Sequence, residues 1–242
     1  MRTRGFTLVE LIVIIAVIGI LAAAVTPSVF QQVMDSRVRA TQDEERTLSE
    51  GMVGDQGQAR YGFVGDIGRL PNSLSELRQS GGLPNYTSAT TRGIGMGWRG
   101  PYVNDGTSTG DYLTDAFGRN YTLNADQVRS AGPDGTLNNA DDIVYPPSAP
   151  TTTGNVTATV KTISGGKTVV DPAGYRVDLF YASNGAELTV QDVASPFSFT
   201  NAHIGIHAIR VVKTAAPNAG LVVAQDTIVI RPGSTTAVEL WF

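Results

Sequence analysis

The stretch Gly5-Phe6-Thr7-Leu8-Val9-Glu10, together with the apolar run behind it, decides how this chain is built. Residues 11–30 contain no charged side chain, and about 20 consecutive apolar residues form a helix long enough to cross a bilayer. Glu10 lies at the leading edge of this run, and Arg2 and Arg4 precede it. A carboxylate at membrane depth costs about 3 kcal/mol or more unless it finds a partner. The pattern therefore predicts a functional acid at the start of a membrane-inserted helix.

The short basic leader (residues 1–5), the Gly-Phe-Thr-Leu-Val-Glu junction and the apolar helix resemble the start of type IV pilins and type II secretion pseudopilins. The resemblance implies that a prepilin peptidase cuts between Gly5 and Phe6 and methylates the new amine of Phe6. It also implies that Glu10 pairs with this amine on a neighbouring subunit. An inner-membrane assembly platform and a cytoplasmic ATPase then drive a helical homopolymer.

The same resemblance implies a location. The precursor is expected in the inner membrane, held by residues 6–30, and the filament in the periplasm or on the cell surface. Two other interpretations remain open. A secretory signal peptide also has a basic start and an apolar core, and Ala22-Ala23-Ala24 offers a small-residue cleavage site. An ordinary single-span anchor needs only the apolar run, but it does not explain an acid four residues beyond a Gly-Phe junction.

Residues 6–52 are predicted to form one long helix within an N-terminal segment that extends to residue 55. Beyond residue 30, opposite charges three or four positions apart support a solvated helix face, and three glycines between residues 51 and 57 end it. Gly19 and Pro27 interrupt the apolar half, and proline removes a helix hydrogen bond, so a kink is expected. In the family that the chain resembles, the segment between these positions can unwind during assembly.

Composition limits the remaining function classes. The net charge is −4 at pH 7, which argues against nonspecific nucleic-acid binding, because such binding needs clustered Lys and Arg. The sequence has no cysteine, so an exported head would have to close its loops without disulfides. Two histidines and no cysteine also leave few ligands for zinc.

Residues 56–145 are interpreted as a first head region with a small pilin-type sheet. A short helix is predicted over residues 73–80, capped by Asn72 or Ser73 and stopped by two glycines. The glycine-rich run 93–97 lacks the Lys-Ser or Lys-Thr of a nucleotide loop, so a flexible loop is predicted there.

Two further segments of this head, residues 98–103 and 115–121, resemble parts of the major pseudopilin of type II secretion. In that protein Gly-Pro-Tyr precedes an Asp-x-aromatic-Gly-x-x-Tyr hairpin. The residues themselves indicate the same structure, because Gly118 can supply a turn while Phe117 and Tyr121 pack a small sheet.

Asp134, Asp141 and Asp142 place three carboxylates within nine positions of a loop rich in Gly and Asn. Such carboxylates repel one another unless they are solvated or neutralised, and hard oxygen ligands suit Ca²⁺. The spacing is not that of an EF-hand, but the loop resembles the calcium loop of the same pseudopilin family. That resemblance implies the three aspartates as ligands, with weaker contributions from the Ala131 carbonyl, the Thr136 hydroxyl and a carbonyl near Asn138 or Asn139. An acidic surface turn is the alternative.

Residues 146–154 are rich in proline and are interpreted as a semi-rigid linker. Residues 155–242 alternate apolar with other residues in short segments separated by turn signals, which predicts a small β-sandwich. The alternating sets lie at residues 156–160, 177–181, 197–199, 204–208, 228–230 and 238–242. The run 197–211 resembles carboxypeptidase-regulatory-like (transthyretin-like) domains, which usually bind or space rather than catalyse. This domain is expected to fold by itself and to lie on the filament exterior.

Little in the sequence indicates catalysis. His203 and His207 fall on one face of a strand, but no third metal ligand is placed by sequence, so packed or exposed strand histidines are the alternative. A nucleophile elbow, Gly-x-Ser-x-Gly, is absent. The predicted class is α+β, with a long N-terminal transmembrane and assembly helix, a small pilin-type head and an all-β sandwich. The predicted function is a structural filament subunit; a ligand-binding or adhesive minor pilin is the alternative.

Overall fold

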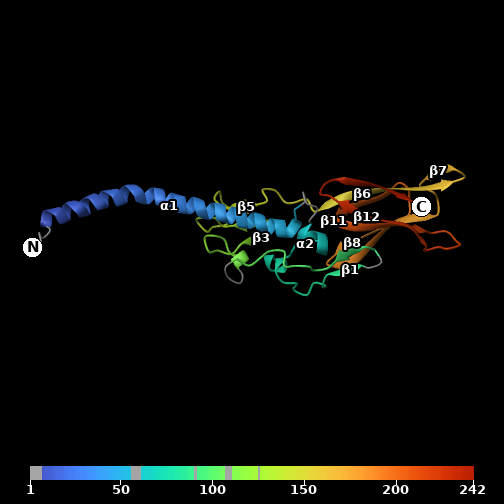
Figure 1. Ribbon diagram of the computed structural model, residues 1–242, viewed down its shortest axis with the longest axis horizontal. Helices are drawn as coiled ribbons and strands as arrows, with labels where there is room; N and C mark the ends of the chain where they lie inside the picture. The colour runs from blue at the N-terminus through green and yellow to red at the C-terminus, as the bar shows by residue number, and fades with distance from the viewer. Residues whose placement is uncertain (1–6, 56–60, 90–91, 107–110, 125) are drawn as a thin grey trace, which may run out of the picture.

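The computed structural model describes residues 7–55, 61–89, 92–106, 111–124 and 126–242. Three parts follow one another along its long axis: a projecting helix, a head of short elements around the second half of that helix, and a β-sandwich at the C-terminal end (Figure 1). The predicted α+β class is confirmed. The predicted cleavage pair, Gly5 and Phe6, lies outside the described residues.

Helix α1 spans Leu8–Val53, 46 residues, and forms the axis of the molecule. Pro27 lies inside it without ending it. The residue before it, Thr26, donates its hydroxyl to the Ala22 carbonyl one turn back at 2.6 Å, and the helix follows a gentle curve over its apolar half (Figure 1). Gly19 and Pro27 therefore do not break α1 in the subunit. Unwinding of the helix between them during assembly stays a prediction.

The second half of α1 is amphipathic. Its buried face repeats every three or four residues, the spacing of one helix face, through Thr41, Glu45, Leu48, Ser49 and Met52. The helix ends as the glycines predicted, because Gly54 follows it with a positive φ of 77° and donates its N–H to the Glu50 carbonyl at 2.7 Å.

Short elements wrap this buried face. They are α2 (Gly62–Ile67), the 3₁₀ helices η2 (Leu74–Leu77) and η3 (Asp111–Leu113), and the strands β1 (Thr87–Ala89), β2 (Ile94–Met96), β3 (Thr122–Asn124), β4 (Gln127–Ser130) and β5 (Ile143–Tyr145). Strands β3, β4 and β5 form one antiparallel sheet, and β1 pairs with β2. The head core packs Leu48 and Met52 of α1 against Phe63, Val64 and Leu77.

Two local predictions in this head were wrong. The helix expected over residues 73–80 is a single 3₁₀ turn, and the Ser73 hydroxyl contacts the Ser75 hydroxyl at 2.8 Å instead of capping the backbone. The flexible loop expected over residues 93–97 contains strand β2, whose Ile94 and Met96 are buried. Their apolar partners lie in the sandwich, too far along the chain for a local pattern to reveal them.

The sandwich consists of β6 (Thr153–Ser164), β7 (Lys167–Val170), β8 (Tyr175–Ser183), β9 (Ala186–Asp192), β10 (Phe197–His203), β11 (Gly205–Lys213), β12 (Val222–Ile230) and β13 (Thr235–Trp241). One sheet has the order β10-β6-β13, with β7 also paired to β6, and the other has the order β12-β11-β8-β9. All pairs are antiparallel except β13 with β6. The predicted alternation holds in β6, where Val156, Ala158 and Val160 are all buried. It is wrong for residues 204–208, because Ile206 is 49 % exposed while His207 between the predicted apolar positions is buried.

The sandwich packs directly on the head. Ile204 belongs to the head core, and Ile94 and Met96 of β2 share a second buried cluster with Phe180, Ala182 and Ala208. The Gly185 N–H donates to the Ile67 carbonyl at 2.8 Å. Strand β6 begins at Thr153, inside the predicted linker. Independent folding of residues 155–242 stays a prediction.

Gly68 lets the two parts approach. A Cβ built on it would lie 1.8 Å from the Ala182 carbonyl oxygen, and its φ is +79°. We expect Gly68→Ala to lower the free energy of unfolding by at least about 2 kcal/mol, because the clash adds to the strain of a positive φ. Thermal and denaturant unfolding of the purified chain measure this.

Gly118→Ala is the matched control for this change. Gly118 has nearly the same φ, +81°, but no atom within 4 Å of the added Cβ, so this variant carries the backbone strain alone. Equal losses of stability in the two variants would show that the contact between head and sandwich is unimportant.

Candidate functional site

The first half of α1 presents an apolar surface all around. Every large apolar side chain between residues 8 and 30 is at least 45 % exposed. Among the described residues, α1 is the helix long and apolar enough to cross a membrane. A helix that is hydrophobic on all faces is normally buried in a core or a bilayer. This surface therefore needs a covering that the subunit does not provide.

Glu10 and Thr7 form a reciprocal cap at the start of this surface. The Thr7 hydroxyl oxygen accepts the Glu10 N–H at 3.2 Å, and Glu10 Oε2 accepts the Thr7 N–H at 3.1 Å and the Thr7 hydroxyl at 2.9 Å. Such a capping box satisfies two backbone donors that the first turn leaves without helix partners. It also fixes the carboxylate at the N-terminal rim of the apolar helix, four residues after Phe6 in sequence.

Gly19 and Pro27, the other predicted assembly positions, lie within the exposed apolar half. A Cβ built on Gly19 would meet no atom within 4 Å. Nothing in the subunit therefore requires a glycine there, so any steric reason for it lies in contacts with other molecules.

A buried acid joins α1 to the head. Glu45 is completely buried, and its Oε1 accepts the Ser130 N–H at 2.9 Å, while Oε2 has no hydrogen-bond partner. The Ser130 hydroxyl donates to Asp115 Oδ2 at 2.5 Å. Burial, reinforced by the nearby negative charge of Asp115, raises the pKa of Glu45 to about 8. Glu45 is therefore largely protonated at neutral pH.

The predicted calcium loop is closed by its own hydrogen bonds. Asp134 accepts the Thr136 N–H at 2.7 Å and the Asn139 side-chain amide at 2.8 Å, and Asp141 accepts the Asp134 N–H at 3.1 Å. The Ala131 carbonyl accepts the Gly135 N–H at 3.0 Å. Asp134 and Asp141 thus lie in one turn, where Thr136 contributes its backbone N–H.

Asp142, the third predicted ligand, contacts Arg129. Its Oδ2 accepts the Asn138 N–H at 2.8 Å and lies 3.4 Å from Arg129, whereas its buried Oδ1 has no partner. Within the described part of the chain, no three Asp, Glu, His or Cys side chains converge as a metal site. The Asp141 carboxylate contacts the backbone of Asp134 rather than its carboxylate, and Asp142 contacts Arg129. A calcium site stays a prediction.

The two histidines do not lie on one face of a single strand as predicted, because His203 ends β10 and His207 belongs to β11. His207 is buried, its Nε2 lies 2.7 Å from the His203 carbonyl oxygen, and both rings meet the Tyr181 ring edge-on. Burial lowers the pKa of His203, and it lowers that of His207 to about 4. Neither ring meets a third metal ligand among the described residues.

Comparison with known proteins identifies a known motif at the N-terminus. The family model of the prokaryotic N-terminal methylation motif matches residues 1–26. Comparison with curated proteins gives no match. The matched segment contains the leader, the Gly5-Phe6 junction, Glu10 and most of the apolar run. The chain therefore carries a prepilin-type processing signal ahead of a membrane-anchoring helix, and both the head and the sandwich lie outside the match.

The raised pKa of Glu45 predicts a specific pH dependence of stability. The folded chain binds the Glu45 proton more tightly than the unfolded chain, and this difference contributes to the free energy of unfolding. The contribution is fully present below pH 4.5, the ordinary pKa, and is lost as the pH rises toward 8. Glu45→Gln keeps an acceptor for Ser130 but cannot ionise. We expect its melting temperature to exceed that of the unchanged chain by an increasing margin between pH 5 and 8.5, reaching about 3 °C or more.

Melting curves over this pH range test the role of Glu45. Asp35→Asn, which removes an exposed carboxylate from the same helix, controls for the change in net charge. A constant offset between Glu45→Gln and the unchanged chain across the range would contradict the prediction.

Proposed function

We propose that the chain is a structural subunit of a type IV pilus-like filament or a type II secretion pseudopilus, and that it polymerises through α1. One observation carries this proposal: the methylation motif and the exposed apolar half of α1 coincide, since the motif covers residues 1–26 and the apolar half residues 8–30. The motif points to a structural subunit and not to an enzyme. It also implies a prepilin peptidase as the processing partner and an assembly platform with its ATPase.

Covering the apolar half of α1 supplies the driving force. Burying one Val, Leu or Ile side chain contributes about 1.5–3 kcal/mol, and the helix exposes such residues in nearly every turn from Leu8 to Phe30. In the precursor the inner membrane covers them. In the filament the same helices of neighbouring copies cover them. The heads lie outside this helix bundle, because the polar half of α1 holds each head beyond residue 37.

Glu10 acts in this assembly as a charged partner. After cleavage, Phe6 carries a free amine, and an amine and a carboxylate in apolar surroundings gain most by pairing with each other. Within the subunit, Glu10 is also the acceptor of the helix cap. The two roles are separable, because glutamine can cap a helix and cannot carry a charge.

A second candidate function is a minor pilin that carries a ligand-binding module. The close packing of the sandwich on the head favours it, because a rigidly mounted module holds a binding surface in a fixed direction. Electron microscopy distinguishes the two functions: a homopolymer supports the structural subunit, and a single copy at a filament tip supports the minor pilin.

We also propose that the head binds Ca²⁺ through Asp134, Asp141 and Asp142, with the Ala131 carbonyl and Thr136 as further ligands. The support is the unpartnered buried Oδ1 of Asp142 and the proximity of Asp134 and Asp141. Binding would require Asp142 to turn from Arg129 toward the other two.

The Glu10 proposal predicts the behaviour of two variants. Glu10→Gln retains the capping acceptor but loses the charge, and we expect filament yield to fall at least tenfold with membrane insertion unchanged. Thr7→Val removes the side-chain cap and leaves the charge, and we expect filaments to persist. Electron microscopy and sedimentation of filaments measure yield.

Processing has to be intact for these comparisons. Intact-mass analysis should show that both variants, like the unchanged chain, begin at Phe6 with one added methyl group. Ordinary filament yield from Glu10→Gln would contradict the charge-pairing role.

The calcium proposal predicts that the chain in detergent melts higher in Ca²⁺ than in chelator. Calcium at a hundredfold excess over Kd stabilises the folded chain by about 2.7 kcal/mol. This corresponds to a rise in melting temperature of roughly 5–10 °C for a domain of this size. Asp141→Asn should erase the difference, and Mg²⁺ should reproduce little of it because it demands tighter octahedral geometry. Identical melting in calcium and in chelator would show that the loop is only a solvated turn.

A further inference from the structure

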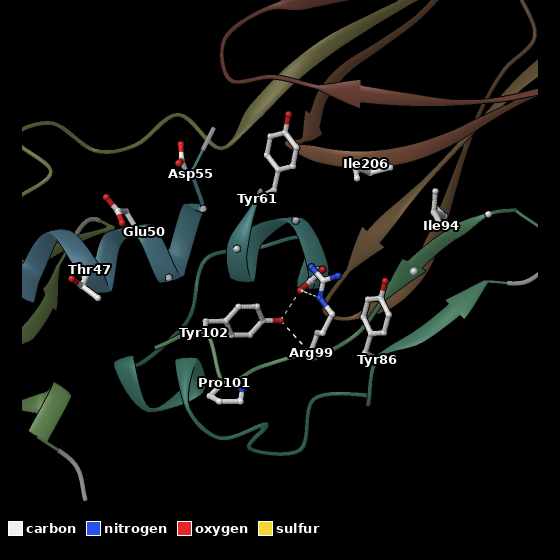
Figure 2. Close-up of a pocket in the computed structure, with 17 residues that line it drawn as sticks. Thr47, Glu50, Asp55, Tyr61, Tyr86, Ile94, Arg99, Pro101, Tyr102 and Ile206 are labelled. Atoms are coloured by element: carbon white, nitrogen blue, oxygen red, sulfur yellow. Dashed lines mark hydrogen bonds and ion pairs between the residues drawn. The ribbon is translucent and has the colours of Figure 1, made fainter. Parts of the chain in front are cut away.

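A cleft of about 750 Å³ lies where the end of α1, α2, β2 and the sandwich meet (Figure 2). Glu50 and Asp55 come from the end of α1, Tyr86 and Arg99 from the segments flanking the β1–β2 hairpin, and Ile206 from β11. Small-molecule sites typically enclose about 300–1,000 Å³ and favour boundaries between domains. The head forms most of the cleft, and the sandwich contributes Ile206 to its lining.

One wall of the cleft carries a fixed guanidinium group. Asp66 Oδ2 accepts the Tyr102 hydroxyl at 3.0 Å and pairs with Arg99 Nε at 3.2 Å, and the Tyr102 hydroxyl oxygen accepts the Arg99 N–H at 3.1 Å. The Asp66 side chain is 10 % exposed and the Arg99 side chain 61 %. A nearly buried carboxylate therefore orients an arginine whose remaining N–H donors face the cleft.

Aromatic and aliphatic surfaces lie beside this arginine. The Arg99 guanidinium carbon is 5.0 Å from the centre of the Tyr86 ring. The Tyr86 hydroxyl lies against Gly95, and a Cβ added to Gly95 would come within 2.0 Å of that hydroxyl. On the sandwich side, Ile206 is 49 % exposed, although its strand neighbours Gly205 and His207 are buried. The cleft thus has apolar faces next to a hydrogen-bond donor.

Acceptors lie across from that donor, where Glu50 and Asp55 form the far wall (Figure 2). Glu50 is already paired with Arg46 at 2.9 Å, as Asp66 is with Arg99. These pairs offset the charges of Glu50 and Asp66, and together with Asp55 they leave the cleft without an excess of positive charge, so it offers no strong attraction for a phosphate. Its polar walls equally disfavour a wholly apolar ligand.

We propose that this cleft binds a neutral saccharide. Sugar hydroxyls both donate and accept, which suits a guanidinium on one wall and carboxylates on the other. The C–H face of a sugar ring packs on aromatic and aliphatic side chains such as Tyr86 and Ile206. The inference stands apart from polymerisation, since a monomeric subunit contains the whole cleft.

A glycan array tests the proposal on the full chain, held in a zwitterionic detergent without a sugar headgroup that could compete. The array presents neutral mono- to tetrasaccharides of hexose, N-acetylhexosamine and deoxyhexose units, together with sulfated and sialylated glycans and lysine-bearing peptides. We expect binding to at least one neutral glycan, with the dissociation constant then measured by calorimetry.

Two variants place this binding in the cleft. Arg99→Ala removes the exposed donor, and Ile206→Arg fills the opening from the sandwich without touching the Arg99 pair; each should weaken binding at least tenfold. Arg99→Ala also leaves the nearly buried Asp66 without its ion pair and is expected to lower the melting temperature. Ile206→Arg, at an exposed position, should leave the melting temperature close to that of the unchanged chain and is therefore the decisive variant. Arg37→Ala, which removes an exposed arginine far along α1, is the matched control and should bind normally.

Three results would overturn the proposal. They are no binding to any neutral glycan, binding confined to the anionic glycans or the peptides, and neutral-glycan binding that persists unchanged in both cleft variants. Ordinary filament yield from Glu10→Gln, which would contradict the charge-pairing role, would leave the glycan result unchanged, so the two proposals fail separately.

Discussion

The subunit depends on one unmet requirement: the apolar half of α1 has no covering of its own. A helix that exposes Val, Leu and Ile on every face is normally buried in a bilayer or in a protein core, so this half of α1 must be covered by something outside the subunit. Pro27 and Gly19 do not relieve this requirement, because α1 runs through both positions as helix. Under the proposed function, the membrane and the filament would each bury the same apolar half of α1.

The other half of the same helix solves a different problem, which is to hold a head. Its buried face combines apolar contacts with Glu45, an acid that finds one backbone donor and lies beside Asp115. A protonated Glu45 satisfies this position without an uncompensated charge. The change from an all-apolar to an amphipathic pattern after Phe30 therefore divides one continuous helix into an apolar, membrane-anchoring part and a part that holds the head.

The sequence is enough to predict features whose cause is local. The long helix follows from the apolar run and the glycines at its end, and the sandwich from alternation such as Val156, Ala158 and Val160. Features that depend on distant partners escaped prediction. Strand β2 is stabilised by Phe180 and Ala208, β9 exposes most of its side chains, and the Arg99–Asp66 pair joins residues with no common motif. The calcium loop shows the same limit, because a local spacing of acids does not reveal that Arg129 faces Asp142.

Close packing between head and sandwich links the two proposals. Gly68 against Ala182, and the shared cluster around Ile94, hold the sandwich at one angle to α1. In a filament of identical subunits, each cleft would then repeat at the same orientation. A single shallow cleft that holds a neutral sugar through a few hydrogen bonds binds weakly. Linked sites that can be engaged together raise the overall affinity by about 10²–10⁴ without any new contact. Polymerisation through α1 would thus convert weak recognition into firm attachment to a surface that presents many glycans.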